Sequence, residues 1–336
     1  FFHKIFKKAY FFSMHCTKRI THGVPQGSVL GPLLFLIYTN DIQHSTKEKL
    51  TLFADDTNIF ITDNNTTHLK KRAEESLRDI KEWFDANKLK VNTTKTDYSV
   101  FASSKHKQPT ELNKMNFNET EIEQSTSCKF LGLTLDNKLN FTEHIDNLTK
   151  QLVKIGTAFK LIRNHLDNND KMKIFNAYFN SKIIYGIETY GSTTERNLKR
   201  LQIQQNRALK ILFNMDIRTG TKSLHHKLQT LLVKDKRNLC LLKIPHQHIH
   251  MPTNNTNTQI TFKQNTNIHE HNTRQTNQLH TPKYKTKIGQ QTVENAAARL
   301  WNELPDRLQT MARPHRFKNH TKEHYLKQYE EPSTPT

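Results

Sequence analysis

The sequence predicts an α+β protein: an antiparallel sheet with helices first, then a purely helical part. Two short runs rich in β-branched and aromatic residues flank the pair Asp55-Asp56, as expected of a tight hairpin with acids at its turn. From Thr142 the spacing of apolar residues changes from two to about 3.6, which indicates helices. We therefore expect a first domain over residues 1–140 and a helical domain over residues 141–245.

Composition favours a polyanionic partner for this chain. The 336 residues contain 51 Lys and Arg against 31 acidic residues, a formal charge of +20. No long basic amphipathic helix stands apart and no apolar run approaches membrane-spanning length, so nucleic acid is favoured over a membrane. Cys16, Cys128 and Cys240 are far apart, which fits a reducing compartment, cytoplasm or nucleus, and argues against a zinc module.

Residues 23–38 (GVPQGSVLGPLLFLIY) form a loop punctuated by Gly and Pro that leads into an apolar helix. Glycines allow close approach of the backbone to a ligand, and prolines stiffen its path. Gln26 offers hydrogen-bond donors and acceptors to a base or a sugar. We expect residues 33–38 to begin a helix that packs beneath the hairpin.

The acid pair could bind a metal ion or could simply be solvated at a turn, as most such pairs are. Neighbouring strand residues point to opposite faces, so only one of the two can aim directly at a given site. Two close carboxylates repel unless a cation neutralises them. Mg²⁺ typically takes one or two carboxylates together with substrate phosphates.

Residues 23–35 and 53–56 together closely resemble motifs B and C of reverse transcriptases, in the form found in LINE-type (non-LTR, jockey-like) retrotransposons. The resemblance implies an RNA-directed DNA polymerase, a nucleotidyltransferase that uses Mg²⁺, or alternatively Mn²⁺, and no small-molecule cofactor. Its partners would be an RNA template, a DNA primer and deoxynucleotide triphosphates, without a membrane. The resemblance makes Asp55 the best metal ligand and Asp56 its weaker neighbour, and it implies nucleotide or template contacts for Pro25, Gln26, Gly27 and Ser28.

Two further segments resemble the same family. Residues 87–96 resemble motif D, which would place the Lys95 amine near the departing pyrophosphate, where it could stabilise negative charge or donate a proton. Residues 129–136 resemble motif E, the primer grip, with Phe130, Leu131 and Gly132 at its centre. An isolated lysine is more often simply solvated, and an alternating run is more often an ordinary hairpin.

The rest of the chain divides by composition. Residues 1–140 would be a partial palm and 141–245 a helical, thumb-like domain whose basic residues either track a template–primer or form a solvated face. Residues 246–285, rich in Thr, Asn, Gln and His, read as a polar linker. A metal site is disfavoured for its histidines, His246, His248, His250, His269 and His271. Residues 286–336 read as a C-terminal helical tail.

One part of the family pattern is missing. Two-metal nucleotidyl transfer needs a further carboxylate, which the family carries on a strand before motif B (motif A). No acidic residue precedes Asp41 in this sequence, so we expect a truncated reverse transcriptase that lacks motif A and the fingers and has little or no activity alone. Asp41, Glu48 and Asp63 are substitutes only in principle. The alternatives are a non-catalytic basic nucleic-acid-binding remnant, a fragment that needs a complementing partner, and a gene-model fragment never made as a stable protein.

Overall fold

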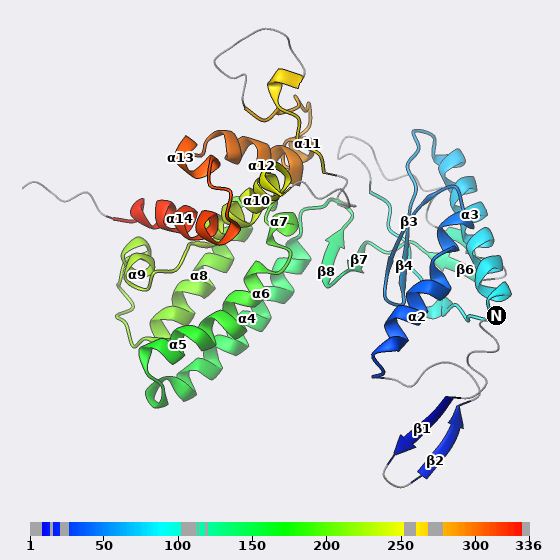
Figure 1. The fold of residues 1–336 in the computed structure, drawn as a ribbon, viewed down its shortest axis with the longest axis horizontal. Coiled ribbons are helices and arrows are strands. Elements are labelled where there is room, and N and C mark those ends of the chain that lie inside the picture. The colour runs from blue at the N-terminus through cyan, green and yellow to red at the C-terminus, as the bar shows by residue number, and fades with distance from the viewer. Residues whose placement is uncertain are drawn as a thin grey trace, which may run out of the picture. The chain divides into compact units, whose positions relative to one another are not determined.

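The computed structural model describes residues 9–13, 16–20, 27–101, 112, 114–117, 120–251, 260–267 and 278–330, and it divides the chain into two compact units. Unit 1 is Phe1–Leu131 and unit 2 is Gly132–Thr336. Short two-stranded sheets, with two helices between them, come first in the chain and helices follow from Thr142, which confirms the predicted α+β class (Figure 1). The division falls after Leu131, whereas the sequence predicts a boundary at residue 140.

Unit 1 consists of hairpins and two helices (Figure 1). Three pairs of its strands are antiparallel: β1 with β2, β3 with β4 and β5 with β6. Its elements are β1 (Ala9–Ser13), β2 (Cys16–Ile20), α2 (Leu30–Thr39), β3 (Lys49–Phe53), β4 (Asp56–Phe60), α3 (Thr66–Ala86), β5 (Lys114–Phe117), β6 (Thr120–Glu123) and β7 (Ser127–Phe130).

The core of unit 1 lies between α3 and the β5–β6 hairpin. Ala73 of α3 packs with Met115 and Phe117 of β5 and Ile122 of β6, all of them buried. Helix α3 buries this one face, and its N-cap Asn65 accepts from the His68 backbone N–H at 3.1 Å. Alternate residues of β5, Met115 and Phe117, are buried, and the residues before each of them are exposed.

Helix α2 is strongly apolar but mostly exposed. Only Gly31 and Thr39 of this helix are buried, whereas Leu33, Leu36 and Ile37 are 53%, 59% and 50% exposed. The structure therefore does not bury this helix beneath the hairpin as the sequence led us to expect. Its far end is held instead by the Tyr38 hydroxyl, which donates to the Asn87 carbonyl just after α3.

Unit 2 is helical apart from its first strand (Figure 1). Its elements are β8 (Leu133–Asp136), α4 (Thr142–Ile162), α5 (Asn168–Ile174), a π-helical segment (Phe175–Asn180), α6 (Ser181–Ile184), α7 (Ile187–Tyr190), α8 (Glu195–Leu212), α9 (Thr221–Lys227), α10 (Val233–His250), α11 (Lys287–Gln290), α12 (Val293–Asn302), α13 (Asp306–Gln309) and α14 (Pro314–Lys327).

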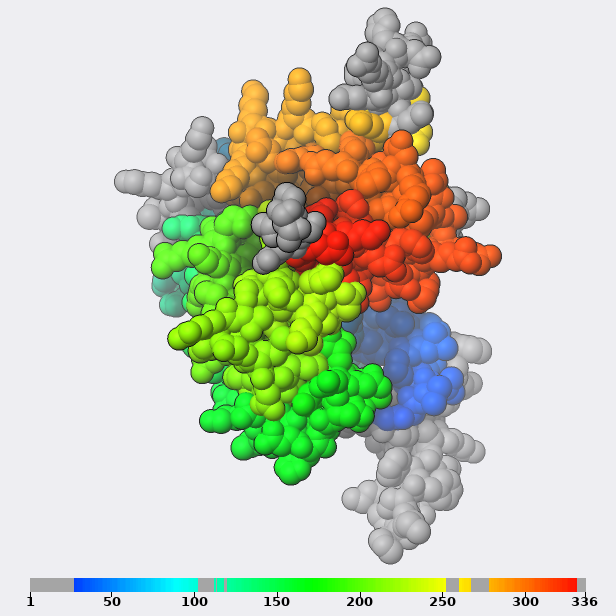
Figure 2. All heavy atoms as spheres, turned by 90° about the vertical axis from the view of Figure 1, so that its left-hand side faces the viewer, coloured from blue at the N-terminus to red at the C-terminus, as the bar shows by residue number. Residues whose placement is uncertain are grey.

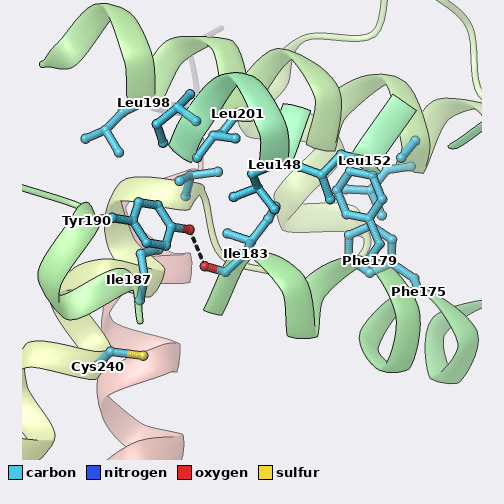
Figure 3. Packing of buried hydrophobic residues seen from close by; sticks show 14 of the residues in the cluster. Leu148, Leu152, Phe175, Phe179, Ile183, Ile187, Tyr190, Leu198, Leu201 and Cys240 are labelled. Carbon is cyan, nitrogen blue, oxygen red and sulfur yellow. Dashed lines mark hydrogen bonds between the residues drawn. The ribbon is translucent and has the colours of Figure 1, made fainter. Parts of the chain in front are cut away.

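The larger core of unit 2 lies between α4, α8 and the helical run from α5 to α7 (Figure 3). Leu148 and Leu152 of α4 face Leu201 of α8, and Phe175 and Phe179 stack below them with ring centroids 5.3 Å apart. The apolar spacing predicted helices here, and they are present. The π-helical segment that carries both phenylalanines was not predicted, because one extra residue per turn leaves no clear mark in the sequence.

A second core joins α10, α12 and α14 through residues such as Leu242, Ala297, Trp301 and Phe317. Helix α10 runs to His250 with Pro245 inside it, so the start of the predicted linker is helical. Phe262 and Leu279, within the same predicted stretch, are also buried in this core.

The histidines at the end of α10 have structural roles. His246 is 2% exposed, stacks on Phe317 at 4.1 Å and donates through Nε2 to the Met311 carbonyl at 2.7 Å. His250 donates in the same way to the Gln309 carbonyl at 2.8 Å. Burial is the main cause that lowers the pKa of His246, in keeping with a neutral ring. His269 and His271 lie outside the described residues.

Within the part of the chain that the structure describes, none of the helices combines the length and the apolar character needed to cross a membrane.

The buried hydroxyl of Tyr190 offers a test of the larger core. This side chain is fully buried and its hydroxyl donates to the Ile183 carbonyl (Figure 3). We expect Tyr190→Phe to lower the free energy of unfolding by about 1–2 kcal/mol, because the carbonyl then loses its buried partner. Urea unfolding measures this loss. Tyr178→Phe is the matched control, since Tyr178 is 64% exposed and should change stability little; equal effects of the two variants would contradict the assignment.

Candidate functional site

The predicted acid pair lies at the turn of the β3–β4 hairpin. The strands are antiparallel, with Lys49 opposite Phe60 at the open end and Phe53 opposite Asp56 at the closed end. Ala54 and Asp55 form the two-residue turn, and Ala54 has a φ of 51°. A positive φ is costly for a residue with a Cβ, and such strain is often found at functional turns. The predicted hairpin is therefore present, with Asp55 at its tip and Asp56 as the first residue of β4.

Both carboxylates are exposed and are not engaged by the protein. Across the described ranges neither of the two carboxylates makes a hydrogen bond or an ion pair, and no third Asp, Glu, His or Cys joins them in a metal-binding group. Oxygen donors of this kind fit Mg²⁺ or Mn²⁺, and two carboxylates are as many as Mg²⁺ typically takes from protein. The pair can thus hold part of a metal's coordination shell, and the remaining ligands have to come from phosphates, water or another carboxylate.

Glu48 and Asp63, named above as substitutes in principle, are occupied by Arg72. The guanidinium of Arg72 lies 2.7 Å from Glu48 Oε1 and 3.0 Å from Asp63 Oδ2, so it clamps the two flanks of the hairpin to α3. Glu48 precedes Lys49, which pairs at the open end of the hairpin, four residues along β3 from Phe53. At 3.3–3.4 Å per residue this separates Glu48 from the turn by more than about 13 Å. These two acids therefore do not share a site with Asp55.

The clamp predicts a pH dependence for unit 1. The Asn65 backbone N–H donates to Asp63 at 2.9 Å and is the largest cause that lowers the pKa of Asp63 to about 2, with Arg72 and His68 adding to it. Because the folded pKa lies below the unfolded value of about 3.9, the contribution is fully present above about pH 4 and is lost as pH falls toward 2. We expect the Asp63→Asn variant to lose less stability than the wild type as the pH falls from about 4 toward 2. Urea midpoints at pH 5 and 2.5, read from the fluorescence of Trp83 in a Trp301→Phe background, measure this; an unchanged slope would contradict it.

The Gly-Pro stretch is described from Gly27 onward, so Pro25 and Gln26 lie outside the described residues. Gly27 has a φ of 85°, a conformation that favours glycine, and open space surrounds the position where a Cβ would stand. The Ser28 hydroxyl accepts from the Gly31 backbone N–H at 3.1 Å and so caps the start of α2. The backbone at Gly27 is open, as predicted, whereas the Ser28 side chain is used to cap α2.

Lys95 ends a short 3₁₀ turn over Thr93–Lys95 and is exposed. Asn92 caps this turn by accepting from the Thr94 backbone N–H at 3.1 Å. The Lys95 amine has no ion-pair partner among the described residues and is free to meet an anion. A role beside a departing pyrophosphate stays a prediction.

The predicted primer-grip residues lie at the boundary of the two units. Phe130 ends β7 and meets Phe60 of β4 edge to face, with ring centroids 5.9 Å apart. The structure thereby brings Phe130 to the hairpin that carries the acids. Leu131 and Gly132 follow with φ of 46° and 78°, as in a tight turn. A Cβ on Gly132 would lie 3.2 Å from the ring of Tyr185, so this glycine allows a close approach.

The sequence did not reveal two contacts that support the site: the Arg72 clamp and the Tyr38–Asn87 hydrogen bond. Arg72 is 24 residues from Glu48, and Tyr38 is 49 residues from Asn87. One signal was available for the clamp, because Asp63 precedes the N-cap Asn65 and Arg72 lies two turns into the helix. Such a spacing is common on solvated helices and selects no partner by itself.

Comparison with known proteins finds similarity to reverse transcriptases of mobile elements. Residues 2–135 match the family described as reverse transcriptase (RNA-dependent DNA polymerase). Similar curated proteins of Drosophila melanogaster include the probable RNA-directed DNA polymerase from transposon X-element, 26% identical over 231 residues, and the RNA-directed DNA polymerase from mobile element jockey, 26% identical over 230 residues. The probable RNA-directed DNA polymerase from transposon BS is 27% identical over 228 residues.

These alignments cover 65%, 65% and 64% of this chain and 25% of each relative. The chain thus spans about a quarter of the length of the curated relatives it matches. No solved structure matches it.

Proposed function

We propose a function on the premise that residues 2–135 of this chain are reverse transcriptase sequence of the LINE (non-LTR) type, as the family match and the retrotransposon relatives indicate. In this proposal the β3–β4 hairpin supplies carboxylates to the metal site of an RNA-directed DNA polymerase. The observation that supports it is the exposed, unengaged Asp55-Asp56 pair at a strained turn, in the segment that matches the family. The substrates would be a nucleic-acid template, a primer and deoxynucleotide triphosphates.

Each residue then has a defined task. Asp55 and Asp56 would hold the divalent metal, and that metal would supply charge stabilisation for nucleotidyl transfer. Gly27 leaves the backbone open to a base or sugar, with Pro25 and Gln26 before it. The Lys95 amine neutralises charge on the departing pyrophosphate.

The contacts of Arg72 explain why the metal site needs a carboxylate beyond Asp55 and Asp56. Glu48 and Asp63 neutralise Arg72, so these two acids cannot complete the metal site. A further carboxylate has to be supplied, and we propose that the 336 residues alone do not extend a primer.

Primer extension on an RNA template with Mg²⁺ tests the proposal. We expect no extension by the 336-residue chain alone, and extension when it is joined to, or mixed with, the segment that precedes the matching region in the jockey polymerase. Chelation of the metal should abolish that activity. Extension by the chain alone that depends on Asp55 would overturn the need for a further carboxylate, whereas no extension under any condition would overturn the polymerase function.

A non-catalytic nucleic-acid-binding role is the second candidate, supported by the charge of +20. It predicts template–primer binding that weakens with salt and is the same for the wild type and Asp55→Asn. Combined with no extension in the complemented assay, this result would favour the second candidate.

A further inference from the structure

The last helix, α14, carries a dense array of cations on its exposed side. Residues 311–328 contain five Lys and Arg, three His and only one acid, Glu323. The opposite side of α14 is buried through Phe317, Thr321, Tyr325 and Leu326. Figure 2 shows this helix (red) at the surface of unit 2, beside the orange segment of α12 and α13. The helix is therefore firmly anchored while its charged side remains accessible.

Two hollows flank the first turns of α14. One, of about 270 Å³, is lined by Pro314, Phe317 and Met251, with Lys243 and Lys318 on its walls. The other, of about 470 Å³, is lined by Arg313, Arg316 and His320 together with Met311 and Ala312. Cations thus stand on both sides of the same helix start, and the first hollow adds an apolar floor.

The cations of this surface are not neutralised by the protein. In the part of the chain that the structure describes, Lys243, Arg313, Arg316 and Lys318 have no acidic partner within 4 Å. The charge of Lys318 also helps to lower the pKa of Lys322, after burial as the main cause. Like charges held this close repel, and an anion placed over them would relieve that repulsion.

We propose that this surface, formed by Arg313, Arg316 and Lys318 with Lys243 of α10, binds single-stranded RNA. Phosphates would lie over the four cations, and one unstacked base would lie against the exposed Pro314 and Met251, which line the first hollow. Apolar surface next to cations can accept a splayed base and its phosphate. The proposal rests on the proposed function only for the choice of RNA as the polyanion; the surface lies in unit 2, outside residues 2–135 that match the polymerase family.

The test compares two charge variants of the full chain by fluorescence anisotropy with a labelled single-stranded RNA. The first is Arg313→Gln/Arg316→Gln/Lys318→Gln. The control is Arg196→Gln/Lys199→Gln/Lys222→Gln, which removes the same charge from exposed positions of α8 and α9. We expect the first variant to raise Kd at least about tenfold near physiological salt. Its slope of log K against log salt should become shallower by about 2, because each phosphate contact on a single strand contributes about 0.7.

Three outcomes would overturn the proposal. Equal weakening by both variants would mean a diffuse electrostatic effect. Equal competition by duplex RNA would mean that no unstacked base is held. Unchanged binding by the first variant would place the RNA elsewhere. Failure of the polymerase proposal is separately visible, since Asp55→Asn should leave this RNA binding intact whether or not the complemented chain extends a primer.

Discussion

Asp55→Asn is expected to lower the rate of metal-dependent primer extension by about 10²- to 10³-fold in a preparation complemented with the missing carboxylate. The reason is electrostatic: a metal at this turn is worth several kcal/mol of charge stabilisation, and a neutral amide cannot hold it. Asp55 is at the tip of the hairpin and is not engaged by other protein groups in the described residues, so the substitution should leave folding unchanged. Single-turnover extension rates at saturating template–primer measure the effect.

Three companion variants sharpen this test. Asp56→Asn should cost less than Asp55→Asn, because adjacent residues at a strand start point in different directions. Asp85→Asn, at an exposed position in the last turn of α3, is the matched control and should keep the wild-type rate. Arg72→Gln should instead lower the urea midpoint of unit 1, since it leaves Glu48 and Asp63 without their partner. A rate that falls equally for Asp55→Asn and Asp85→Asn would argue against a metal at the turn.

The second large effect is expected from Phe179→Ala, which should lower the free energy of unfolding by about 3–5 kcal/mol. Phe179 is fully buried, stacks on Phe175 at 5.3 Å and lies 6.2 Å from the ring of Phe159. Removing the ring leaves a cavity between α4 and the π-helical segment that the flanking helices can fill only in part (Figure 3). Such a loss is a large share of the stability of an ordinary domain.

The chain offers a clean readout and a control for this prediction. Trp83 and Trp301 are its two tryptophans, one in each unit, so Trp301 fluorescence in a Trp83→Phe background reports on unit 2. Tyr178→Ala changes the neighbouring residue, which is 64% exposed, and should cost no more than about 0.5 kcal/mol. If Tyr178→Ala destabilises unit 2 as much as Phe179→Ala, the packing described for the π-helical segment is wrong.

Local patterns determined much of this protein from its sequence. The apolar spacing of α4 and α8 predicted these helices, because one buried face imposes the helical period on the residues themselves. The alternating runs around Asp55 predicted the hairpin, and the motifs in residues 23–35 and 53–56 resemble the reverse transcriptase family whose model matches residues 2–135.

Tertiary structure alone decided which polar and apolar groups meet. Arg72 binds Glu48, which is 24 residues away, together with Asp63, and His246 is buried against Phe317 although its segment has the composition of a linker. The apolar helix α2 stays largely exposed, and a π-helical turn interrupts a regular stripe. The periodicity of apolar residues shows which face of a segment has to be buried. Which residues cover that face depends on contacts between separate segments, and no local pattern encodes these.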